Sequence, residues 1–232
     1  ISNYTKKIKK NILLDNINIK MESGKIYGMC GRNGSGKTML MRAISGLINP
    51  DEGYVKIDEK IIGKDISFPE SIGLLLEYPG FVRKYSGFKN LKMIASLKGI
   101  AGDNQIKNTM IKTGLNPENK KSFGSYSLGM KQKLGIACAI MENPELIILD
   151  EPVNALDEFS IKNIAGIIEE QKNNGALIIV SAHSKELLLS FCDEIFYMDD
   201  GRIIKNEKIP LNWQTPKEVI EYVKNNLEKI GT

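Results

Sequence analysis

The chain has 232 residues, enough for one large domain or for a domain with a smaller sub-domain. Its 32 basic and 28 acidic residues leave a net charge of +4, too small to indicate a nucleic-acid-binding protein. No apolar run approaches the roughly 18 residues of a membrane span, and no signal peptide opens the chain. The three cysteines are widely separated, so they give no metal spacing and suit a reducing compartment. We therefore expect a cytoplasmic protein or one held at the inner face of the membrane by a partner.

The first predicted elements surround a glycine-rich loop. Residues 16–20 alternate polar and apolar side chains, as a strand with one buried face does, and residues 26–30 form the short apolar run of a buried strand. Residues 39–47 then show a helical pattern that ends near Gly46. The basic run at residues 6–10 is interpreted as a solvated loop.

Between that strand and helix, residues 31–38 match G-x-x-x-x-G-K-[ST], the phosphate-binding P-loop. A strand, a glycine loop and a helix N-terminus together direct backbone N–H groups at an anion. We expect Lys37 to reach the β- and γ-phosphates of a nucleoside triphosphate and the Thr38 hydroxyl to bind Mg²⁺. The predicted nucleotide-binding residues are Gly31, Arg32, Asn33, Gly34, Ser35, Gly36, Lys37, Thr38 and Met39.

Helical patterns replace strand patterns in the middle of the chain. Strands are predicted at residues 54–57 and 72–76, and the turn that begins at Glu77 opens a stretch of about residues 81–143. Helices are expected there over residues 88–97, 104–113 and 127–142. We interpret the stretch as a helical sub-domain inserted between two strands. Ser127 and Gly129 make the start of its third helix either an anion-binding terminus or an ordinary capped helix.

The core resumes at residue 144 and is followed by an extension. Apolar or alternating runs predict strands at residues 146–149, 177–180, 194–198 and 202–205. Asp157 is expected to cap one helix, and a shorter helix is expected over residues 185–191. A capping box from Thr215 to Glu218, followed by an apolar stripe, predicts a C-terminal extension helix within residues 206–232.

Two carboxylates, Asp150 and Glu151, directly follow the strand at residues 146–149. In a P-loop protein a carboxylate at such a strand end holds Mg²⁺, usually through water, and the next one can act as a general base on the attacking water. Adjacent carboxylates repel each other unless a cation lies between them. His183, the only histidine, follows the strand at residues 177–180 and is either a structural hydrogen-bonding group or a ligand of the same site.

In this order the motifs resemble those of the ATP-binding subunit of ABC transporters, over residues 1 to about 205. The motifs are the P-loop, Glu77, Ser-Leu-Gly-Met-Lys-Gln from Ser127, Leu-Ile-Ile-Leu-Asp-Glu-Pro from Leu146, Asn154 to Asp157, and His183. The resemblance implies an α/β fold in which a P-loop RecA-like core, residues 1–80 and 144–205, carries an antiparallel β sub-domain and the inserted helical sub-domain.

The resemblance also implies roles for residues, with ATP and Mg²⁺ as cofactors and a membrane permease subunit as partner. Two such subunits pair head to tail, each signature acting on the other subunit's ATP. The implied signature residues are Ser127, Leu128, Gly129 and Met130, the dimer-contact residues are Ala155 and Asp157, and the catalytic residues are Lys37, Glu151 and His183, with His183 at the γ-phosphate. The family places an aromatic residue against adenine, for which Tyr4 is the candidate.

The chain departs from the common family pattern at the signature and at Glu77. Leu128 replaces the first glycine of Leu-Ser-Gly-Gly-Gln, Met130 replaces its glutamine, and Glu77 stands where most members have glutamine. These features resemble the branch of bacterial exporters that confers self-protection or resistance against lantibiotics and bacitracin. The Glu77 carboxylate is expected to meet Mg²⁺ or its waters, since hard cations prefer oxygen ligands; a solvated loop glutamate is the alternative.

Other functions remain open to the sequence. An ABC-type ATPase acting on nucleic acid or ribosomes would typically carry two cassettes or a long coiled-coil insertion, and neither is found here. A nucleotide-dependent sensor that hardly hydrolyses ATP would agree with the altered signature. A small-molecule kinase would not explain the Asp150–Glu151 pair and the Asn154 to Asp157 run, which favour hydrolysis at a dimer interface.

Overall fold

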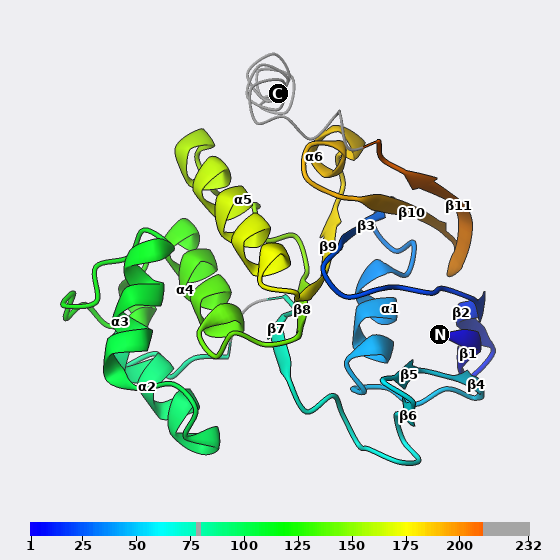
Figure 1. Ribbon diagram of the computed structural model, residues 1–232, viewed down its shortest axis with the longest axis horizontal. Coiled ribbons are helices and arrows are strands. Elements are labelled where there is room, and N and C mark those ends of the chain that lie inside the picture. Colours follow the sequence, from blue (N-terminus) through cyan, green and yellow to red (C-terminus); the bar gives the residue numbers. More distant parts are fainter. Residues whose placement is uncertain (78–79, 211–232) are drawn as a thin grey trace.

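The computed structural model describes residues 1–77 and 80–210, and its centre is a six-stranded sheet (Figure 1). The strand order is β11-β10-β3-β9-β8-β7; β11 is antiparallel to β10 and every other neighbouring pair is parallel. The strands are β3 (Ile26–Cys30), β7 (Ile72–Leu75), β8 (Leu146–Leu149), β9 (Leu177–Ala182), β10 (Glu194–Asp199) and β11 (Arg202–Lys208).

Apolar layers cover both faces of this sheet, which explains why its inner strands are continuously apolar. Successive residues of a strand point to opposite faces, so Ile147 packs with α5 (Glu158–Asn173) and α6 (Lys185–Leu189). Ile148 packs in a separate cluster with α1 (Lys37–Ile44). The sheet is therefore the middle of a three-layer α/β core.

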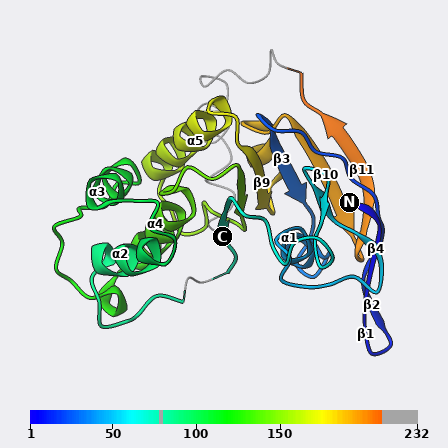
Figure 2. The same cartoon turned by 60° about the horizontal axis from the view of Figure 1, so that its bottom comes forward.

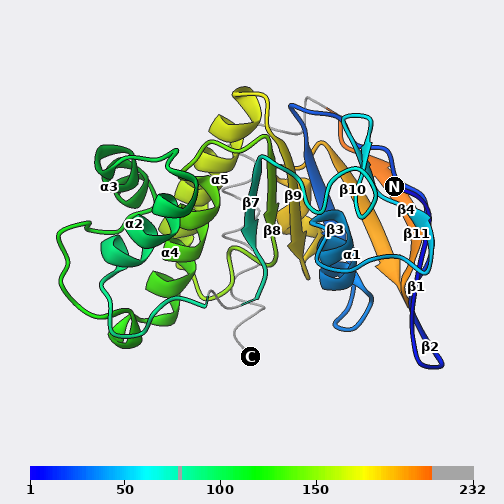
Figure 3. The ribbon, with the colours of Figure 1, turned by 90° about the horizontal axis from the view of Figure 1, so that it is seen from below.

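An antiparallel sheet of order β2-β1-β4 extends the layer that contains α1. Its strands are β1 (Ser2–Ile8), β2 (Asn11–Ile17) and β4 (Glu52–Tyr54), and a separate hairpin pairs β5 (Lys56–Ile57) with β6 (Lys60–Ile61). Figures 2 and 3 show the β1–β2 hairpin at one end of the molecule, and the helical region at the other.

The helical region is inserted between β7 and β8 and has its own apolar cluster, which includes Leu91, Met110 and Leu134. It contains α2 (Gly87–Lys98), α3 (Asp103–Lys112), a 3₁₀ turn η1 (Phe123–Ser125) and α4 (Leu128–Ile140). Its α4 lies directly against β7: a Cβ atom added to Gly73 of β7 would be only 1.7 Å from the carbonyl oxygen of Ala139 in α4. Glycine is thus required where the helical region meets the sheet.

The fold expected from the sequence, an α/β core with an antiparallel β sub-domain and an inserted helical region, is confirmed. The three helices expected between residues 81 and 143 are α2, α3 and α4, with ends within two residues of those predicted. In the part of the chain that the structure describes, no helix is long and apolar enough to cross a membrane.

Three predictions near the ends of the chain are wrong in whole or in part. The basic run at residues 6–10 is not a loop throughout, because Lys6 and Lys7 belong to β1, and the strand expected at residues 16–20 is β2, which ends at Ile17. The expected extension cannot begin at residue 206, because residues 206–208 complete β11. The remainder of the predicted C-terminal helix, at residues 211–232, lies outside the described residues.

Candidate active site

The predicted chemical residues gather at one edge of the sheet because three neighbouring parallel strands end there. Cys30 of β3 is paired with Ala182 of β9, and Leu149 of β8 is paired with Val180 of the same strand. The P-loop after β3, Asp150 after β8 and the end of β9 therefore meet. This is the edge at which open α/β sheets bind ligands.

The P-loop forms a close backbone cradle. Gly34 and Gly36 have φ angles of 80° and 105°, which glycine adopts without the steric cost that other residues incur. A Cβ atom on Gly31 would lie 2.5 Å from both the Met198 carbonyl oxygen and the Ser35 hydroxyl. No side chain caps the start of α1, so its first N–H groups remain open to an anion.

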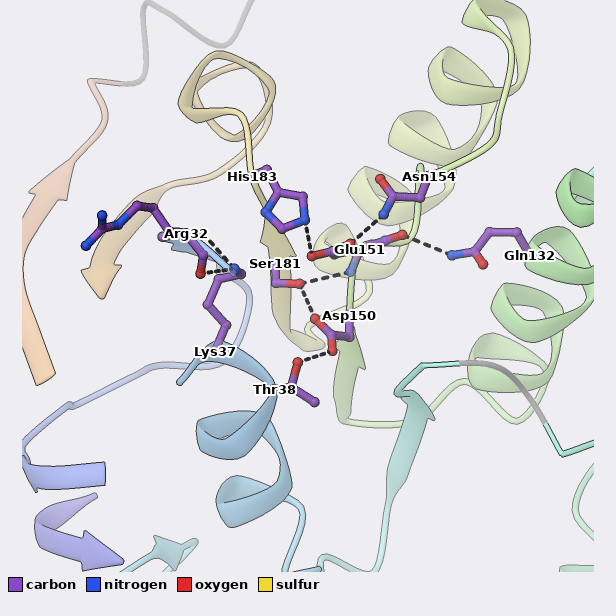
Figure 4. A network of polar contacts seen from close by, with 10 residues as sticks. Arg32, Lys37, Thr38, Gln132, Asp150, Glu151, Asn154, Ser181 and His183 are labelled. Carbon is purple, nitrogen blue, oxygen red and sulfur yellow. Dashed lines mark hydrogen bonds and ion pairs between the residues drawn. The ribbon is translucent and has the colours of Figure 1, made fainter. Parts of the chain in front are cut away.

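Two polar side chains of the loop lack the partner that a phosphate would supply. The Ser35 hydroxyl is buried and makes no hydrogen bond within the described residues. Lys37 is 5% exposed, and its Nζ donates hydrogen bonds to the carbonyl oxygens of Gly31 at 2.6 Å and Arg32 at 3.1 Å (Figure 4). A buried ammonium with only carbonyl partners fits a loop built to receive a polyphosphate.

Asp150 lies between Thr38 and Ser181, with each carboxylate oxygen accepting one hydroxyl (Figure 4). Thr38 Oγ1 is 2.6 Å from Asp150 Oδ2, and the Ser181 hydroxyl donates to Oδ1. Asp150 is 9% exposed. The Thr38 hydroxyl and the Asp150 carboxylate are oxygen ligands of the kind that Mg²⁺ prefers, since this ion is usually bound by one or two carboxylates together with phosphate oxygens and water.

Glu151 is held from several sides. Its Oε1 is 2.6 Å from His183 Nε2, its Oε2 accepts a hydrogen bond from the Asn154 amide, and its backbone N–H donates to the Ser181 hydroxyl at 2.9 Å. Its carbonyl oxygen accepts from Gln132 at 3.0 Å. Its φ angle of 50° is uncommon for a residue other than glycine, and such backbone strain concentrates at functional sites.

Two adjoining cavities open onto these groups. One, of about 700 Å³, extends from Glu151 along the P-loop, including Asn33 and Met39, to residues 10–13 of the β1–β2 hairpin. The other, of about 250 Å³, is lined by Thr38, Glu77, Leu128, Gln132, Asp150, Glu151 and Asn154. The first reaches from the P-loop residues that are expected to bind phosphates to residues 10–13 of the hairpin.

The adenine-stacking role expected for Tyr4 is wrong. Tyr4 is fully buried, and its hydroxyl donates a hydrogen bond to the Ile48 carbonyl oxygen at 2.9 Å. Burial raises the pKa of Tyr4 to about 12. The side chain is thus part of the packing between β1 and α1, with no face open to a ligand. The hairpin end of the large cavity instead presents Ile12, whose side chain is half exposed, and Leu13.

Glu77 and Arg32 are in the region of the site but have partners of their own. Glu77 lines the smaller cavity with Thr38 and Asp150, while its carboxylate forms a 2.7 Å ion pair with Arg42, one turn after Thr38 on α1. Arg32 extends into solvent and pairs with Asp199 at 3.0 Å. Among the described residues, no group of three or more His, Cys, Asp or Glu side chains is arranged to hold a metal ion.

The signature residues lie next to the expected dimer-contact residues of the same chain. The Ser127 hydroxyl caps α4 by accepting a hydrogen bond from the Met130 N–H at 3.2 Å, and Leu128 is 46% exposed. A Cβ atom on Gly129 would lie 3.0 Å from the Ala155 carbonyl oxygen. Asp157 caps α5 through the Ser160 N–H at 2.8 Å. Roles across a dimer remain predictions, because a single chain describes only one side of such a contact.

Ser181 and Gln132 are members of the network that the sequence reasoning missed. The sequence shows Ser181 only as a hydroxyl directly after the apolar run at residues 177–180, and the structure buries it fully. Its pairing with Asp150 follows from the register of β8 against β9, in which Leu149 lies beside Val180. Gln132, 9% exposed, was noted only as part of the signature run, with no sign that it would reach Glu151.

The P-loop, the Thr38–Asp150 pair and the Glu151–His183 pair thus lie together at one edge of the parallel sheet. The family model described as ABC transporter matches residues 14–154, and the chain therefore belongs to that family as an ATP-binding subunit and an ATPase.

Curated relatives agree over most of the chain. The uncharacterized ABC transporter ATP-binding protein YybJ of Bacillus subtilis is 46% identical over 209 residues, which cover 90% of this chain and 96% of YybJ. The bacitracin transport ATP-binding protein BcrA of Enterococcus faecalis is 36% identical, covering 89% of this chain and 68% of BcrA. The lantibiotic transport ATP-binding protein SrtF of Streptococcus pyogenes is 33% identical, covering 88% of each chain.

Solved structures show the same fold. A dimeric ATP-binding cassette, MJ0796 bound to ADP and phosphate after hydrolysis, superposes with a TM-score of 0.81 at 22% identity, over 90% of this chain and 97% of that one. The cbiO1 subunit from Clostridium perfringens superposes with a TM-score of 0.77 at 27% identity, over all of this chain and 96% of that one. ABC ATP-binding subunits form dimers and work with membrane permeases, and this chain shares their architecture.

Proposed function

We propose that this subunit hydrolyses ATP to drive an exporter that protects the cell from peptide antibiotics of the bacitracin or lantibiotic kind. The observation that carries the ATPase role is the network that joins Thr38, Asp150, Ser181, Glu151 and His183 at one edge of the sheet, beside the buried Lys37 of the P-loop. The substrate class is supported by similarity to two relatives, BcrA and SrtF, whose names describe transport of bacitracin and of a lantibiotic.

In the proposed reaction a water attacks the γ-phosphorus of ATP, Glu151 accepts a proton from that water, and ADP and phosphate leave. His183 and Asn154 hold the Glu151 carboxylate from two sides, so the base is oriented before ATP arrives. His183, whose Nε2 is 2.6 Å from Glu151 Oε1, is the residue that we propose contacts the γ-phosphate when the base turns toward the water.

The remaining loop residues bind and orient the triphosphate. Lys37 exchanges its two carbonyl partners for phosphate oxygens, and the Ser35 hydroxyl gains the partner that it lacks. Thr38 and Asp150 are the residues that would hold Mg²⁺, with Ser181 fixing the second oxygen of Asp150. The ion, when bound, offsets the negative charge that develops on the transferred phosphoryl group.

Dimerisation and attachment to a permease complete the proposal. Ser127 and Gly129 act on the ATP of a second subunit, with Ala155 and Asp157 at the contact. A cavity of about 490 Å³ between core and helical region, lined by residues that include Arg42, Leu76, Phe81 and Ile94, is the proposed permease site. This places the subunit at the inner face of the membrane. Because Arg42 lines this groove and its partner Glu77 lines the catalytic cavity, that ion pair lies between the two sites.

The proposal is tested in a sensitive strain that expresses the subunit with its permease. We expect the wild type to raise the inhibitory concentration of bacitracin or a lantibiotic, and Glu151→Gln to abolish the protection. Glu145→Gln, an exposed carboxylate immediately before the same strand β8, is the matched control and should protect normally. An active ATPase that protects against none of these peptides would contradict the substrate class, whereas full protection by Glu151→Gln would contradict the mechanism.

A further inference from the structure

The charges of this chain are divided unevenly between its two parts. Residues 81–143, the helical region, carry 11 Lys or Arg and 3 Asp or Glu, a net charge of +8. The rest of the chain carries 21 and 25, a net charge of −4, so the overall value of +4 conceals a strongly basic helical region. Such an asymmetry between parts of a molecule indicates an acidic partner for the basic part.

Ion pairs neutralise only part of this charge. On the outer helices, Lys92 pairs with Asp103 at 2.7 Å and Lys107 pairs with Glu118 at 2.7 Å. Within the described residues no ion pair joins a carboxylate to any of five other cations, which we name the basic face: Arg83, Lys84, Lys89, Lys121 and Lys131. Lys120 and Lys133 also make no ion pair within the described residues, so five of the seven cations of the helical region without an ion pair belong to the basic face.

The basic face is held together by two chain segments that run side by side. The Gly124 N–H donates to the Arg83 carbonyl oxygen at 2.9 Å, and the Phe123 N–H donates to the Tyr85 carbonyl oxygen at 2.7 Å. The backbones of Ser86 and Ser122 form an isolated antiparallel β-bridge. Two of its lysines lie over the rings of this pair of segments. Lys89 Nζ is 3.9 Å from the Tyr85 ring centre and Lys131 Nζ is 5.7 Å from that of Phe123.

This face borders the groove in which the permease is proposed to dock. Phe81 lines the groove, and its ring packs edge-on against Phe123 with centres 5.1 Å apart. Val82, the next residue, leaves 38% of its surface exposed beside Arg83. If the groove meets a permease, the basic face lies toward the membrane in which that permease is embedded. The inference rests in this respect on the proposed function.

We propose that the basic face binds the anionic lipid head groups of the cytoplasmic leaflet beside the permease. Cytoplasmic loops of membrane proteins are enriched in Lys and Arg, so a permease loop would repel this face, whereas anionic lipids attract clustered Lys and Arg. The exposed Val82 and the half-buried Tyr85 add the aliphatic and aromatic side chains that favour a bilayer interface.

The test is sedimentation of the purified full chain with phosphatidylcholine vesicles. One set contains phosphatidylglycerol as about one lipid in three, and the other set contains none. We expect binding to the anionic vesicles only, with loss in high salt. Reversal of Arg83, Lys84, Lys89 and Lys121 to Glu should weaken it at least about tenfold. Reversal of Lys9, Lys20, Lys64 and Lys208, four exposed lysines elsewhere, is the matched control and should retain most of it.

Equal binding by the two variants, or no binding of the wild type, would overturn the proposal. So would a basic-face variant that binds the vesicles normally but fails to co-purify with the permease, because the partner would then be an acidic protein segment. ATP turnover and the thermal midpoint of both variants are measured in parallel. Since neither variant touches the P-loop or Glu151, normal turnover with lost vesicle binding separates this inference from the ATPase mechanism.

Discussion

The nucleotide edge of the sheet and the helical region differ in how their polar groups are satisfied. At the edge, Asp150 and Glu151 are contacted by Thr38 at the start of α1 and by Ser181 and His183 at the end of β9, elements that are far apart in the sequence. In the helical region, the Ser86 and Ser127 hydroxyls cap their own helices, and the basic face presents exposed cations such as Arg83 and Lys84. The first arrangement fixes a chemical site inside one chain, and the second presents a surface for other molecules.

The junction between the two regions should be the most sensitive point of the fold. We expect Gly73→Ala to lower the free energy of unfolding by about 3 kcal/mol or more, because a Cβ atom there meets the backbone of α4. Gly166→Ala in α5, where a Cβ atom meets nothing within 4 Å, is the matched control and should raise it by about 0.5–1 kcal/mol. Chemical denaturation measures both, and equal effects would contradict the packing of α4 against β7.

Ser181→Ala tests whether the edge acts as one network. The change removes the hydroxyl that bonds both Asp150 Oδ1 and the Glu151 N–H. Because it leaves polar groups at a largely buried position without a partner, it should lower the free energy of unfolding by about 1–3 kcal/mol. We expect the Mg²⁺ concentration for half-maximal ATP turnover to rise about 10–100-fold. Ser45→Ala is the control, since that buried hydroxyl bonds only the carbonyl of Arg42. An unchanged Mg²⁺ dependence would remove Ser181 from the site.

Two matched helix caps test whether the helical region contributes to catalysis. The Ser86 and Ser127 hydroxyls each accept a backbone N–H at 3.2 Å, at the starts of α2 and α4. Replacing either with Ala should cost about 1 kcal/mol of stability. Only Ser127→Ala should also lower ATP turnover per subunit at concentrations where dimers form. Equal turnover in the two variants would reduce Ser127 to an ordinary cap.

The last prediction is a loss of stability at alkaline pH. Burial raises the pKa of Cys138 to about 12 and that of Tyr4 to about 12, and it raises the pKa of Cys192 well above 9. A group whose pKa is higher in the folded than in the unfolded state stabilises the fold fully at a pH below its unfolded-state pKa. This stabilisation is lost as the pH rises through the folded-state pKa. The thermal midpoint should therefore fall between about pH 9 and 12, less steeply in Cys138→Ala. A midpoint that stays constant over this range would contradict the burial of these groups.

The sequence predicted the parts of the site that local motifs encode. The P-loop, the Asp150–Glu151 pair and the caps at Ser127 and Asp157 depend on residues close together in the chain. Ser181 was missed because its role depends on the register between two strands separated by a helix. No local pattern contains that information.

Strand β1 shows the opposite failure, in which a local signal was misleading. Lys6 and Lys7 suggested a loop, but they lie on the middle strand of the β2-β1-β4 sheet and form ion pairs with Asp51 and Glu52, at and just before the neighbouring strand β4. Missing this strand also misplaced Tyr4, whose ring points into the core with Leu14 and Leu40 rather than into the nucleotide cavity. Which face of a strand is buried depends on the tertiary packing around it.

The central claim is that Glu151 is the base of an otherwise complete ATP site, and one measurement tests it most directly. ATP affinity and steady-state ATP hydrolysis are compared between the wild type and Glu151→Gln, with Mg²⁺ present. The amide keeps the shape of the side chain and a hydrogen bond to His183 but cannot accept the proton. We predict nearly unchanged affinity with turnover reduced at least about 100-fold. Turnover equal to that of the wild type would contradict the account.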